Sequence, residues 1–310
     1  SRCLNLARGI REKRPEVKIV FLGDFDEIPT QMIEKYKMVK TSHFVSIDDE
    51  MSFAKDFDYF ILDNYFINQD YIDQYCEKSI KFIKIDDFND LDLERVDVVV
   101  NFCLRGTDFN YGSKKQLLGV NYFPIRKEFK LIRLKNIIQF KDRLKNILVF
   151  LGGGGQHNAG YMMVELLDQV LSDTNITLLT DVNPNHGFKS INNNKIIFSP
   201  FSSKMEKYLE NTDVAITGGG LTKYECAYNC IPNASLTQNF DQDAEAQTFA
   251  NAGLTYYLGM AENLYLQKDN VVKKLNDFLS LNVRNTLFEN VKKKFITDST
   301  QNLVDAVLEN

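Results

Sequence analysis

The sequence predicts an α/β protein built from two doubly wound domains with parallel sheets. Short apolar runs at 17–22, 59–62, 80–85 and 96–101 recur along the first half, with helical or loop segments between them. Their nearly continuous hydrophobicity is typical of parallel strands that are buried on both faces. The length of 310 residues also predicts two domains, at about 100 to 200 residues per domain.

The composition excludes several classes of protein. With 44% hydrophobic and 25% charged residues, the chain is neither wholly disordered nor collagenous nor a coiled coil. A net charge of −5 provides no global positive field for a nucleic-acid backbone, so no nucleic-acid partner is expected. No apolar run reaches the ~20 residues of a membrane-spanning helix, so no membrane span is expected.

The cysteines indicate a reducing compartment. The five cysteines form no CxxC pair, which is typical of free thiols and predicts a cytoplasmic protein. They combine with no histidine at a spacing typical of metal ligands. We therefore expect no metal, and no other feature of the sequence indicates a cofactor.

The chain is expected to begin inside a helix. Cys3, Leu6, Ala7 and Ile10 have the i, i+3, i+4 and i+7 spacing of a buried helical stripe. A doubly wound domain that begins with a helix lacks its first strand, which is central in such sheets and close to the ligand. We therefore expect a truncated chain, with this strand before Ser1.

The domain junction is predicted in the basic, weakly periodic segment 131–145. This divides the chain into an N-terminal Rossmann-like domain, 1–135, and a C-terminal one, 136–310. In the second domain, strand 147–151 leads into a glycine run and a helix. Further strands are expected at 176–179, 195–198, 214–217 and 234–237. The segment 270–308 is predicted to form amphipathic helices, the last of which packs back across the junction.

Two glycine loops each lie between a predicted strand and a predicted helix. Residues without side chains let backbone N–H groups approach an anion, and the helix N-terminus adds the positive end of its dipole. Both loops follow strands of one sheet, so we expect them to converge on one crevice and to bind a diphosphate. The alternative is a pair of tight turns. The residues assigned to this site are Gly152, Gly153, Gly154, Gly155, Gly218, Gly219, Gly220 and Leu221.

The loops match neither the GxGxxG pattern of dinucleotide-binding domains nor a Walker loop, which argues against NAD and ATP. After the second loop, Thr222 is expected to cap the helix or bind a phosphate. Glu225, one turn further, is expected to accept hydrogen bonds from ribose hydroxyls. The alternative is an ordinary cap and a surface acid. Further along, Asn239, or Asp241 with Gln242, is expected to contact phosphate or sugar, although a carboxylate would repel a diphosphate.

In the first half, Asp63 and Tyr65 directly follow a buried strand, where an acid could orient a nucleophilic water or bind a sugar amide. The alternative is a plain turn at the strand end. The pair Asp86 and Asp87 is interpreted as capping the segment that follows it. His157 is interpreted as a surface or capping residue. No role is predicted for the two other histidines, His43 and His186.

The order of motifs in the second half resembles the nucleotide-binding domain of GT-B enzymes. The motifs are Gly218-Gly219-Gly220, Thr222-x-x-Glu225, Ile231-Pro232, Gln238-Asn239, Asp241-Gln242 and Ala252-Gly253. The first half adds Arg2, the segment 62–65, Asp86-Asp87, Asn101 and the segment 119–129. Together they are similar to the PseG/SpsG-like UDP-sugar hydrolases of pseudaminic-acid and spore-coat polysaccharide biosynthesis, which are similar to GT28-type glycosyltransferases.

The resemblance implies a GT-B fold, in which two Rossmann-like domains face a central cleft. It implies UDP in the C-terminal domain, the sugar between the two halves, and no metal or cofactor. The implied reaction is hydrolysis of a UDP-linked 2,4-diacetamido-2,4,6-trideoxy sugar at its anomeric carbon. The base of the family is a histidine in a Gly-His-x-x-Arg motif. Arg2 matches its arginine, so the histidine is expected just upstream of Ser1, and Asp63 and Tyr65 are the catalytic candidates within the chain.

Two other functions stay open at this point. A GT-B glycosyltransferase would make the same nucleotide contacts and transfer the sugar to an acceptor hydroxyl. A patch suited to docking a lipid acceptor is not evident in the first half. A nucleotide-sugar binding module without activity is the other alternative. The resemblance also suggests a fused or associated enzyme of a sialic-acid-type pathway, such as a cytidylyltransferase.

Overall fold

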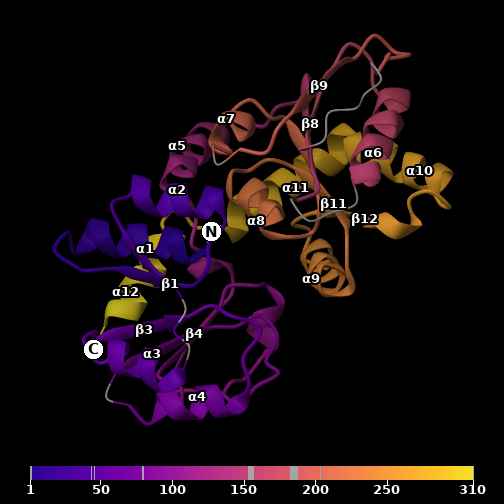
Figure 1. Cartoon of the computed structure of the whole chain (residues 1–310). Coiled ribbons are helices and arrows are strands. Elements are labelled where there is room, and N and C mark those ends of the chain that lie inside the picture. The colour runs from indigo at the N-terminus through magenta and orange to yellow at the C-terminus, as the bar shows by residue number, and fades with distance from the viewer. Residues whose placement is uncertain are drawn as a thin grey trace. The chain divides into compact units, whose positions relative to one another are not determined.

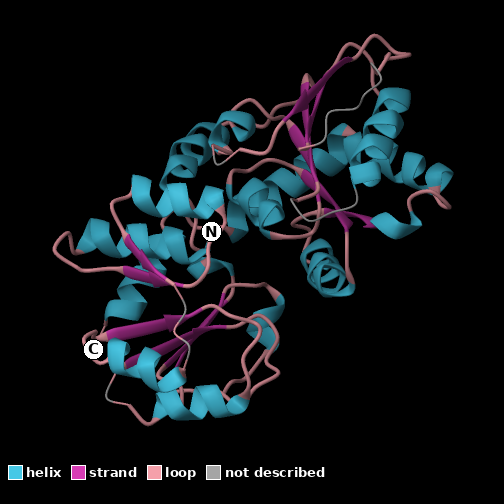
Figure 2. Cartoon of the chain, in the orientation of Figure 1, coloured by secondary structure: helices cyan, strands magenta, loops and turns pink. Residues whose placement is uncertain are grey.

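The structure is a computed structural model that describes residues 2–42, 44, 46–78, 80–152, 157–181, 188–202 and 204–309. The chain divides into two compact units (Figure 1). Unit 1 comprises Ser1–Arg126 and Asp298–Asn310, and unit 2 comprises Lys127–Thr297. Each unit combines parallel strands with helices (Figure 2). The predicted α/β class with parallel sheets is confirmed.

Unit 1 contains two parallel sheets among its described residues. In the smaller sheet, β1 (Val20–Leu22) pairs with β2 (Val39–Thr41). The larger sheet has the order β3 (Tyr59–Leu62), β4 (Lys81–Ile85), β5 (Val98–Asn101), β6 (Lys115–Leu118). The inner strands β4 and β5 are almost wholly buried, which accounts for the high share of apolar residues in their sequences. The expected strand before Ser1 stays a prediction.

Seven helices of unit 1 accompany these sheets in the described residues. They are α1 (Arg2–Lys13), α2 (Glu27–Lys35), α3 (Ile47–Ala54), α4 (Gln69–Cys76), the 3-10 helices η1 (Arg105–Asp108) and η2 (Val120–Tyr122), and α12 (Ser299–Leu308). The last helix packs against α1 and η2 (Figure 1). The Ser299 hydroxyl donates a hydrogen bond to the carbonyl oxygen of Phe123 over 2.9 Å. Helix α12 therefore belongs to unit 1.

Unit 2 contains one six-stranded parallel sheet with the order β12-β11-β10-β7-β8-β9. Its strands are β7 (Asn146–Phe150), β8 (Asn175–Leu179), β9 (Lys195–Ser199), β10 (Val214–Thr217), β11 (Asn233–Thr237) and β12 (Tyr256–Met260). Its helices are α5 (Lys127–Asn136), α6 (His157–Val170), α7 (Glu206–Leu209), α8 (Leu221–Tyr228), α9 (Phe240–Asn251), η3 (Ala261–Asn263), α10 (Lys268–Leu279) and α11 (Leu281–Lys294). The core of the unit includes Val149, Leu167, Ile216 and Leu236.

The chain passes from unit 1 to unit 2 between Arg126 and Lys127, whereas the sequence places the junction at 135/136. The reason is the packing of α5. Arg133 is 1% exposed, and its guanidinium donates hydrogen bonds to the carbonyl oxygens of Tyr228 and Phe295. A buried guanidinium needs such acceptors, so α5 belongs to the unit that supplies them.

None of the helices in the described ranges is both long enough and apolar enough to cross a membrane.

Candidate functional site

The strand order of the unit 2 sheet reverses between β7 and β10. From β7 the chain builds β8 and β9 on one side, and it then returns to place β10 on the other side of β7. Open α/β sheets bind ligands at the carboxyl ends of strands beside such a reversal. Phe150 and Thr217 are partners in the β7–β10 register. The loops that begin after these strands, with Gly152 and Gly218, therefore start at the same edge of the sheet.

The two loops approach each other so closely that Gly218 has no room for a side chain. A Cβ atom on Gly218 would lie 2.0 Å from the carbonyl oxygen of Leu151, a distance that non-bonded atoms do not reach. Gly219 has φ of +79°, which favours glycine. At Gly220, an added Cβ would meet no atom of the described residues within 4 Å. Gly153, Gly154 and Gly155, which the sequence assigns to the same site, lie outside the described residues.

Gln238 joins the loops that follow β7, β10 and β11. Its Nε2 donates a hydrogen bond to the carbonyl oxygen of Leu151 and lies 3.0 Å from the position of a Cβ on Gly218. In the sequence, Gln238 belongs to the Gln238-Asn239 motif, for which no role of the glutamine is predicted. Its place immediately after a buried strand that neighbours β10 is the feature that could have identified it.

Helix α8 begins directly at the second glycine bend. Its N-cap is Gly220, so Thr222 is not the cap and lies within the first turn. The alternative contact of Thr222 with a phosphate stays a prediction. Glu225 lies one turn further along α8 and is buried. The order Gly220, Thr222, Glu225 thus runs from the bend into the helix, as the sequence predicts.

Lys223 folds back from α8 onto the bend. It is 1% exposed, and its Nζ donates to the carbonyl oxygens of Gly219 and, at 3.5 Å, of Gly220. In a trans peptide the N–H group points away from the carbonyl. The N–H groups of Gly220 and Leu221, which share these peptides, are therefore turned away from the ammonium group. The sequence analysis predicts no role for Lys223.

The loop after β11 leads into α9. Asn239 is the N-cap of α9, and its Oδ1 accepts a hydrogen bond from the backbone N–H of Gln242 over 2.9 Å. Gln242 lies against the bend, because a Cβ on Gly219 would lie 3.3 Å from the Cβ of Gln242. Asp241 is exposed in the first turn of the helix. The structure therefore brings Gln242 to the glycine bend and gives the oxygen of Asn239 a capping role.

A second group of polar residues lies in unit 1, where β3 and β4 end. Leu62 and Lys84 are partners in the β3–β4 register, so Asp63 and the pair Asp86-Asp87 follow neighbouring strands. Arg2, in the first turn of α1, is 7% exposed. Its Nη2 lies 2.6 Å from Oδ1 of Asp63, and its Nη1 lies 2.7 Å from Oδ2 of Asp87.

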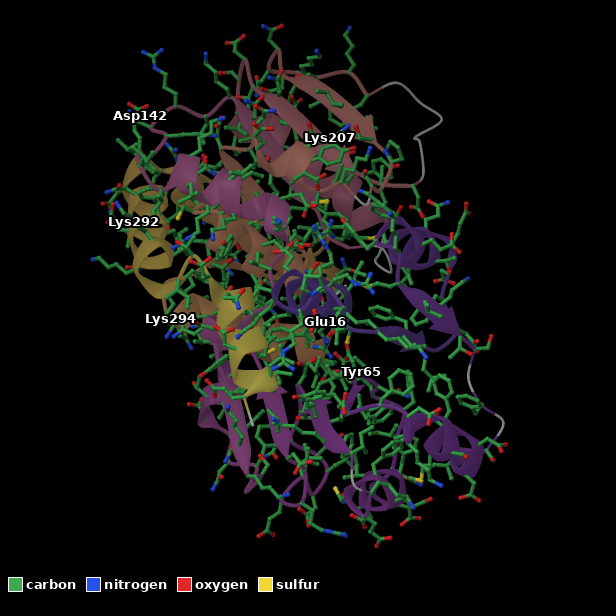
Figure 3. The ribbon with its side chains drawn as sticks, turned by 90° about the vertical axis from the view of Figure 1, so that its left-hand side faces the viewer. Glu16, Tyr65, Asp142, Lys207, Lys292 and Lys294 are labelled. Carbon is green, nitrogen blue, oxygen red and sulfur yellow. The ribbon has the colours of Figure 1, made fainter. Side chains whose placement is uncertain are left out.

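Tyr65 completes this group. Its hydroxyl accepts a hydrogen bond from Nη2 of Arg2 over 2.7 Å and donates one to Oδ2 of Asp87. Figure 3 labels Tyr65, which comes from the loop after β3. We call Arg2, Asp63, Tyr65 and Asp87 the Arg2 network.

The capping interpretation of Asp86 and Asp87 is correct for only one of them. Oδ2 of Asp86 accepts hydrogen bonds from the backbone N–H groups of Phe88 and Asn89, over 3.0 and 2.7 Å. Asp87 instead pairs with Arg2. The two residues have different partners because successive side chains at the end of a strand point to opposite sides.

The electrostatics of the Arg2 network keep Asp63 charged and Tyr65 neutral. Burial by itself would raise the pKa of Asp63, but the hydrogen bonds and charge of Arg2 outweigh it and lower this pKa below its usual range. Burial, reinforced by the charge of Asp87, raises the pKa of Tyr65 against the opposing charge of Arg2. Near neutral pH, Asp63 is therefore a poor proton acceptor, and Tyr65 keeps its proton.

The buried side chain of Lys84 holds the loops after β3 and β4, which carry Asp63, Tyr65 and Asp87. Nζ of Lys84 donates to the carbonyl oxygens of Asn64 and Ile85, over 3.1 and 2.8 Å. Burial lowers the pKa of Lys84. These bonds fix the segment between Asp63 and Tyr65. Buried charged groups are costly and gather at functional sites, so this region is the candidate site of unit 1.

Two of the three histidines, His43 and His186, lie outside the described residues. His157 is the first residue of α6.

Sequence comparisons identify two curated relatives, whereas no family model matches the chain. Uncharacterized protein MJ1062 of Methanocaldococcus jannaschii is 26% identical over 257 residues, or 77% of this chain and 52% of the relative. Spore coat polysaccharide biosynthesis protein SpsG of Bacillus subtilis is 25% identical over 197 residues, or 60% of this chain and 57% of SpsG. The chain thus spans about half the length of the curated relatives it matches.

Solved structures share the fold over nearly the whole chain. MurG of Acinetobacter baumannii has a TM-score of 0.69 at 13% identity, over 99% of this chain and 94% of MurG. UDP-GlcNAc 2-epimerase of Neisseria meningitidis, solved bound to UDP-GlcNAc, has a TM-score of 0.60 at 11% identity, over 100% of this chain and 96% of the epimerase. At these identities the likeness shows the fold.

Proposed function

Because this chain has the two-domain GT-B fold and resembles SpsG in sequence, we propose that it acts on a nucleotide sugar in polysaccharide biosynthesis. The proposed reaction is hydrolysis of a UDP-linked 2,4-diacetamido-2,4,6-trideoxy sugar to free sugar and UDP. The observation that carries the proposal is the convergence of Gly152, Gly218 and Gln238 at the edge of the sheet where β7 and β10 end.

The diphosphate of UDP would bind at the glycine bend. The N–H groups of Gly220 and Leu221 are turned away from Lys223, and the N-terminus of α8 adds its positive dipole end, an arrangement that favours phosphate. Among the residues that the structure describes, none lies within 4 Å of a Cβ added to Gly220, so they leave this space open to a phosphate. Glu225 would accept hydrogen bonds from the ribose hydroxyls. The likeness to an epimerase solved with UDP-GlcNAc supports this choice of nucleotide.

The Arg2 network would bind and orient rather than take up a proton. Asp63 has a lowered pKa, and its ionised carboxylate accepts hydrogen bonds from Arg2 and from the thiol of Cys3, so it would hold Arg2 and Tyr65 in position for the substrate. Tyr65 keeps its proton and can donate it in a hydrogen bond. In the proposed reaction, water attacks the anomeric carbon, the bond to the UDP oxygen breaks, and UDP leaves with the electron pair. The water proton goes to the histidine that the family resemblance implies just upstream of Ser1.

The proposal is tested by incubating the full-length protein with the UDP-activated diacetamido-trideoxyhexose and measuring free UDP. Release without any acceptor is the expected result. Turnover that requires an acceptor hydroxyl would identify a glycosyltransferase, and binding of UDP without turnover would identify a binding module. A titration that shows no binding of UDP would overturn the proposal altogether.

Lys223→Met is expected to weaken the binding of UDP about 10-fold, because charged hydrogen bonds contribute about 1.5 to 3 kcal/mol. The variant removes the bonds that turn the N–H groups of Gly220 and Leu221 outward. Uridine, which has no phosphate, should bind as before. Isothermal titration with both ligands measures the difference, and Lys207→Met, at an exposed lysine of the same unit (Figure 3), is the control. Equal losses for uridine and UDP would contradict the prediction.

Glu225→Gln is expected to reduce the affinity for UDP about 10-fold, since it replaces a charged acceptor with a neutral one of the same shape. The affinity for a UDP analogue without the ribose 2′- and 3′-hydroxyls should not change. The comparison is made by titration of both ligands with both proteins. If the variant loses affinity for the analogue as well, Glu225 does not act through the ribose.

A further inference from the structure

We propose that the loops after β3 and β4 form a subsite for the N-acylamino group of a sugar. In this subsite Asp87 accepts the amide hydrogen, and the rings of Tyr65 and Phe88 pack against the acyl methyl group. The choice of a sugar as the ligand rests on the proposed function. The proposed sugar carries acylamino groups, and the subsite assigns the recognition of one of them to residues with no role in the nucleotide contacts.

Aromatic side chains are exposed where β3 and β4 end. Tyr65, Phe66 and Phe88 are 52%, 96% and 37% exposed, and we call them the aromatic platform. The rings of Tyr65 and Phe88 lie edge to face, with their centroids 5.3 Å apart. Single exposed apolar residues are common, but a group of them beside a buried polar network is typical of a ligand site.

The Tyr65 ring of the aromatic platform is held in place before any ligand arrives. The Tyr65 hydroxyl is bonded to both Arg2 and Asp87, and Cζ of Arg2 lies 5.4 Å from the centroid of the Tyr65 ring. The ring therefore cannot turn without breaking these contacts, although half of its surface is exposed. A ring that is already ordered loses little side-chain entropy when a ligand packs on it.

The hydrogen bonds of the Arg2 network leave one carboxylate oxygen with spare capacity. Both oxygens of Asp63 accept bonds from Arg2, and Oδ2 of Asp87 accepts from Arg2 and Tyr65. Oδ1 of Asp87 receives only a 3.7 Å contact from the thiol of Cys103 among the contacts of the described residues, and a thiol is a weak donor. Oδ1 of Asp87 can therefore accept a further hydrogen bond beside the platform.

An N-acylamino group matches this combination. It carries an N–H donor and an apolar methyl group on one planar unit, so a single substituent can satisfy Asp87 and cover the rings of Tyr65 and Phe88. A hydroxyl group would supply the donor without the apolar part. A free amine would be charged and strongly hydrated, and it would leave the rings exposed to water.

The test uses the full-length protein with free sugars, so that it depends on neither UDP nor turnover. Saturation-transfer NMR is recorded with N-acetylglucosamine, glucosamine and glucose. We expect the acetyl methyl protons to receive the most saturation and glucose to receive little. Asp87→Asn and Phe88→Ala should each reduce the methyl signal at least 5-fold, in line with the loss of one charged hydrogen bond or one ring contact. The controls are Asp90→Asn, at an exposed acid of the same loop, and Phe240→Ala, at an exposed phenylalanine of unit 2.

Each outcome separates this inference from the proposed function. Equal saturation of glucose and N-acetylglucosamine, or no saturation of either, would overturn the subsite. So would a methyl signal that survives in both Asp87→Asn and Phe88→Ala. Because Phe88 takes no part in the ion pairs, its variant keeps the test valid if Asp87→Asn fails to fold. A UDP titration of the same samples is independent: UDP binding without acetyl selectivity would leave the proposed function standing, and acetyl selectivity without UDP binding would leave the subsite standing.

Discussion

Gly218→Ala is expected to destabilise unit 2 strongly and to abolish the binding of UDP. The new methyl group would lie 2.0 Å from the carbonyl oxygen of Leu151 and 2.6 Å from its carbonyl carbon. Both atoms belong to the backbone at the end of β7, which cannot move away without disturbing the sheet. Overpacking of this kind costs about 3 kcal/mol or more, which corresponds to a fall in Tm of about 6 to 12 °C in a unit of this size. Thermal unfolding monitored by circular dichroism measures it.

Gly220→Ala is the matched control on the same bend. In the described part of the chain an added Cβ meets no atom within 4 Å there, and φ is −80°, which any residue can adopt. The Tm should therefore stay within about 2 °C of the original value, as for an ordinary surface substitution. Affinity for UDP should still fall, because the methyl group enters the space proposed for the diphosphate. Equal Tm values for the two variants would show that the close approach of Gly218 to Leu151 is not required for the stability of unit 2.

Arg2→Met is expected to destabilise unit 1 by about 3 kcal/mol near neutral pH. Removing one partner of a buried ion pair leaves the other charge without compensation, and here two carboxylates, Asp63 and Asp87, lose the same guanidinium. Arg14→Met, at an exposed arginine just after α1, should cost less than about 0.5 kcal/mol. Urea unfolding of the full-length protein gives the free energy of unfolding for both variants.

The pH dependence of Arg2→Met distinguishes the ion pairs from simple packing. In the original protein the pKa of Asp63 is lowered, so its stabilising contribution is present above the unfolded-state pKa, about 4, and is lost as pH falls through the folded-state value. In the variant, burial without Arg2 raises this pKa. The deficit in stability should therefore be largest above about pH 5 and should shrink below about pH 4. A deficit that does not change with pH would mean that Arg2 contributes packing only.

The sequence predicts the inner strands well and misses three strands at sheet edges. The inner strands β4, β5 and β10 are buried along almost their whole length, and most of their residues are apolar, as in KFIKI, VVVN and VAIT. The missed strands, β2, β6 and β12, each lie at the end of a sheet order in the described residues. An edge strand is covered less completely, and its sequence is mixed, as in VKT, KQLL and YYLGM. Such runs have no periodicity that separates them from loops.

The site shows the same division between local and long-range information. Asp63 and Tyr65 can be selected from the sequence because they directly follow an apolar run. Asp87 belongs to the same network because Arg2 binds both Asp63 and Asp87. Along the chain, Arg2 is 61 residues from Asp63 and 85 residues from Asp87. The inward direction of the Lys223 side chain is likewise absent from the sequence. A lysine in a helix is usually exposed, and here the carbonyl groups of the bend accept hydrogen bonds from the buried ammonium group.

By itself the amino-acid sequence determined the α/β class, the parallel strands and the glycine bends, because each of these depends on neighbours within a few residues. The tertiary structure decided that α5 joins unit 2, that Gln238 closes onto Leu151, and that Arg2 binds two carboxylates. These features depend on groups brought together from distant parts of the chain. A buried charge or amide takes whichever partner the fold supplies, and that partner is not encoded in the residues beside it.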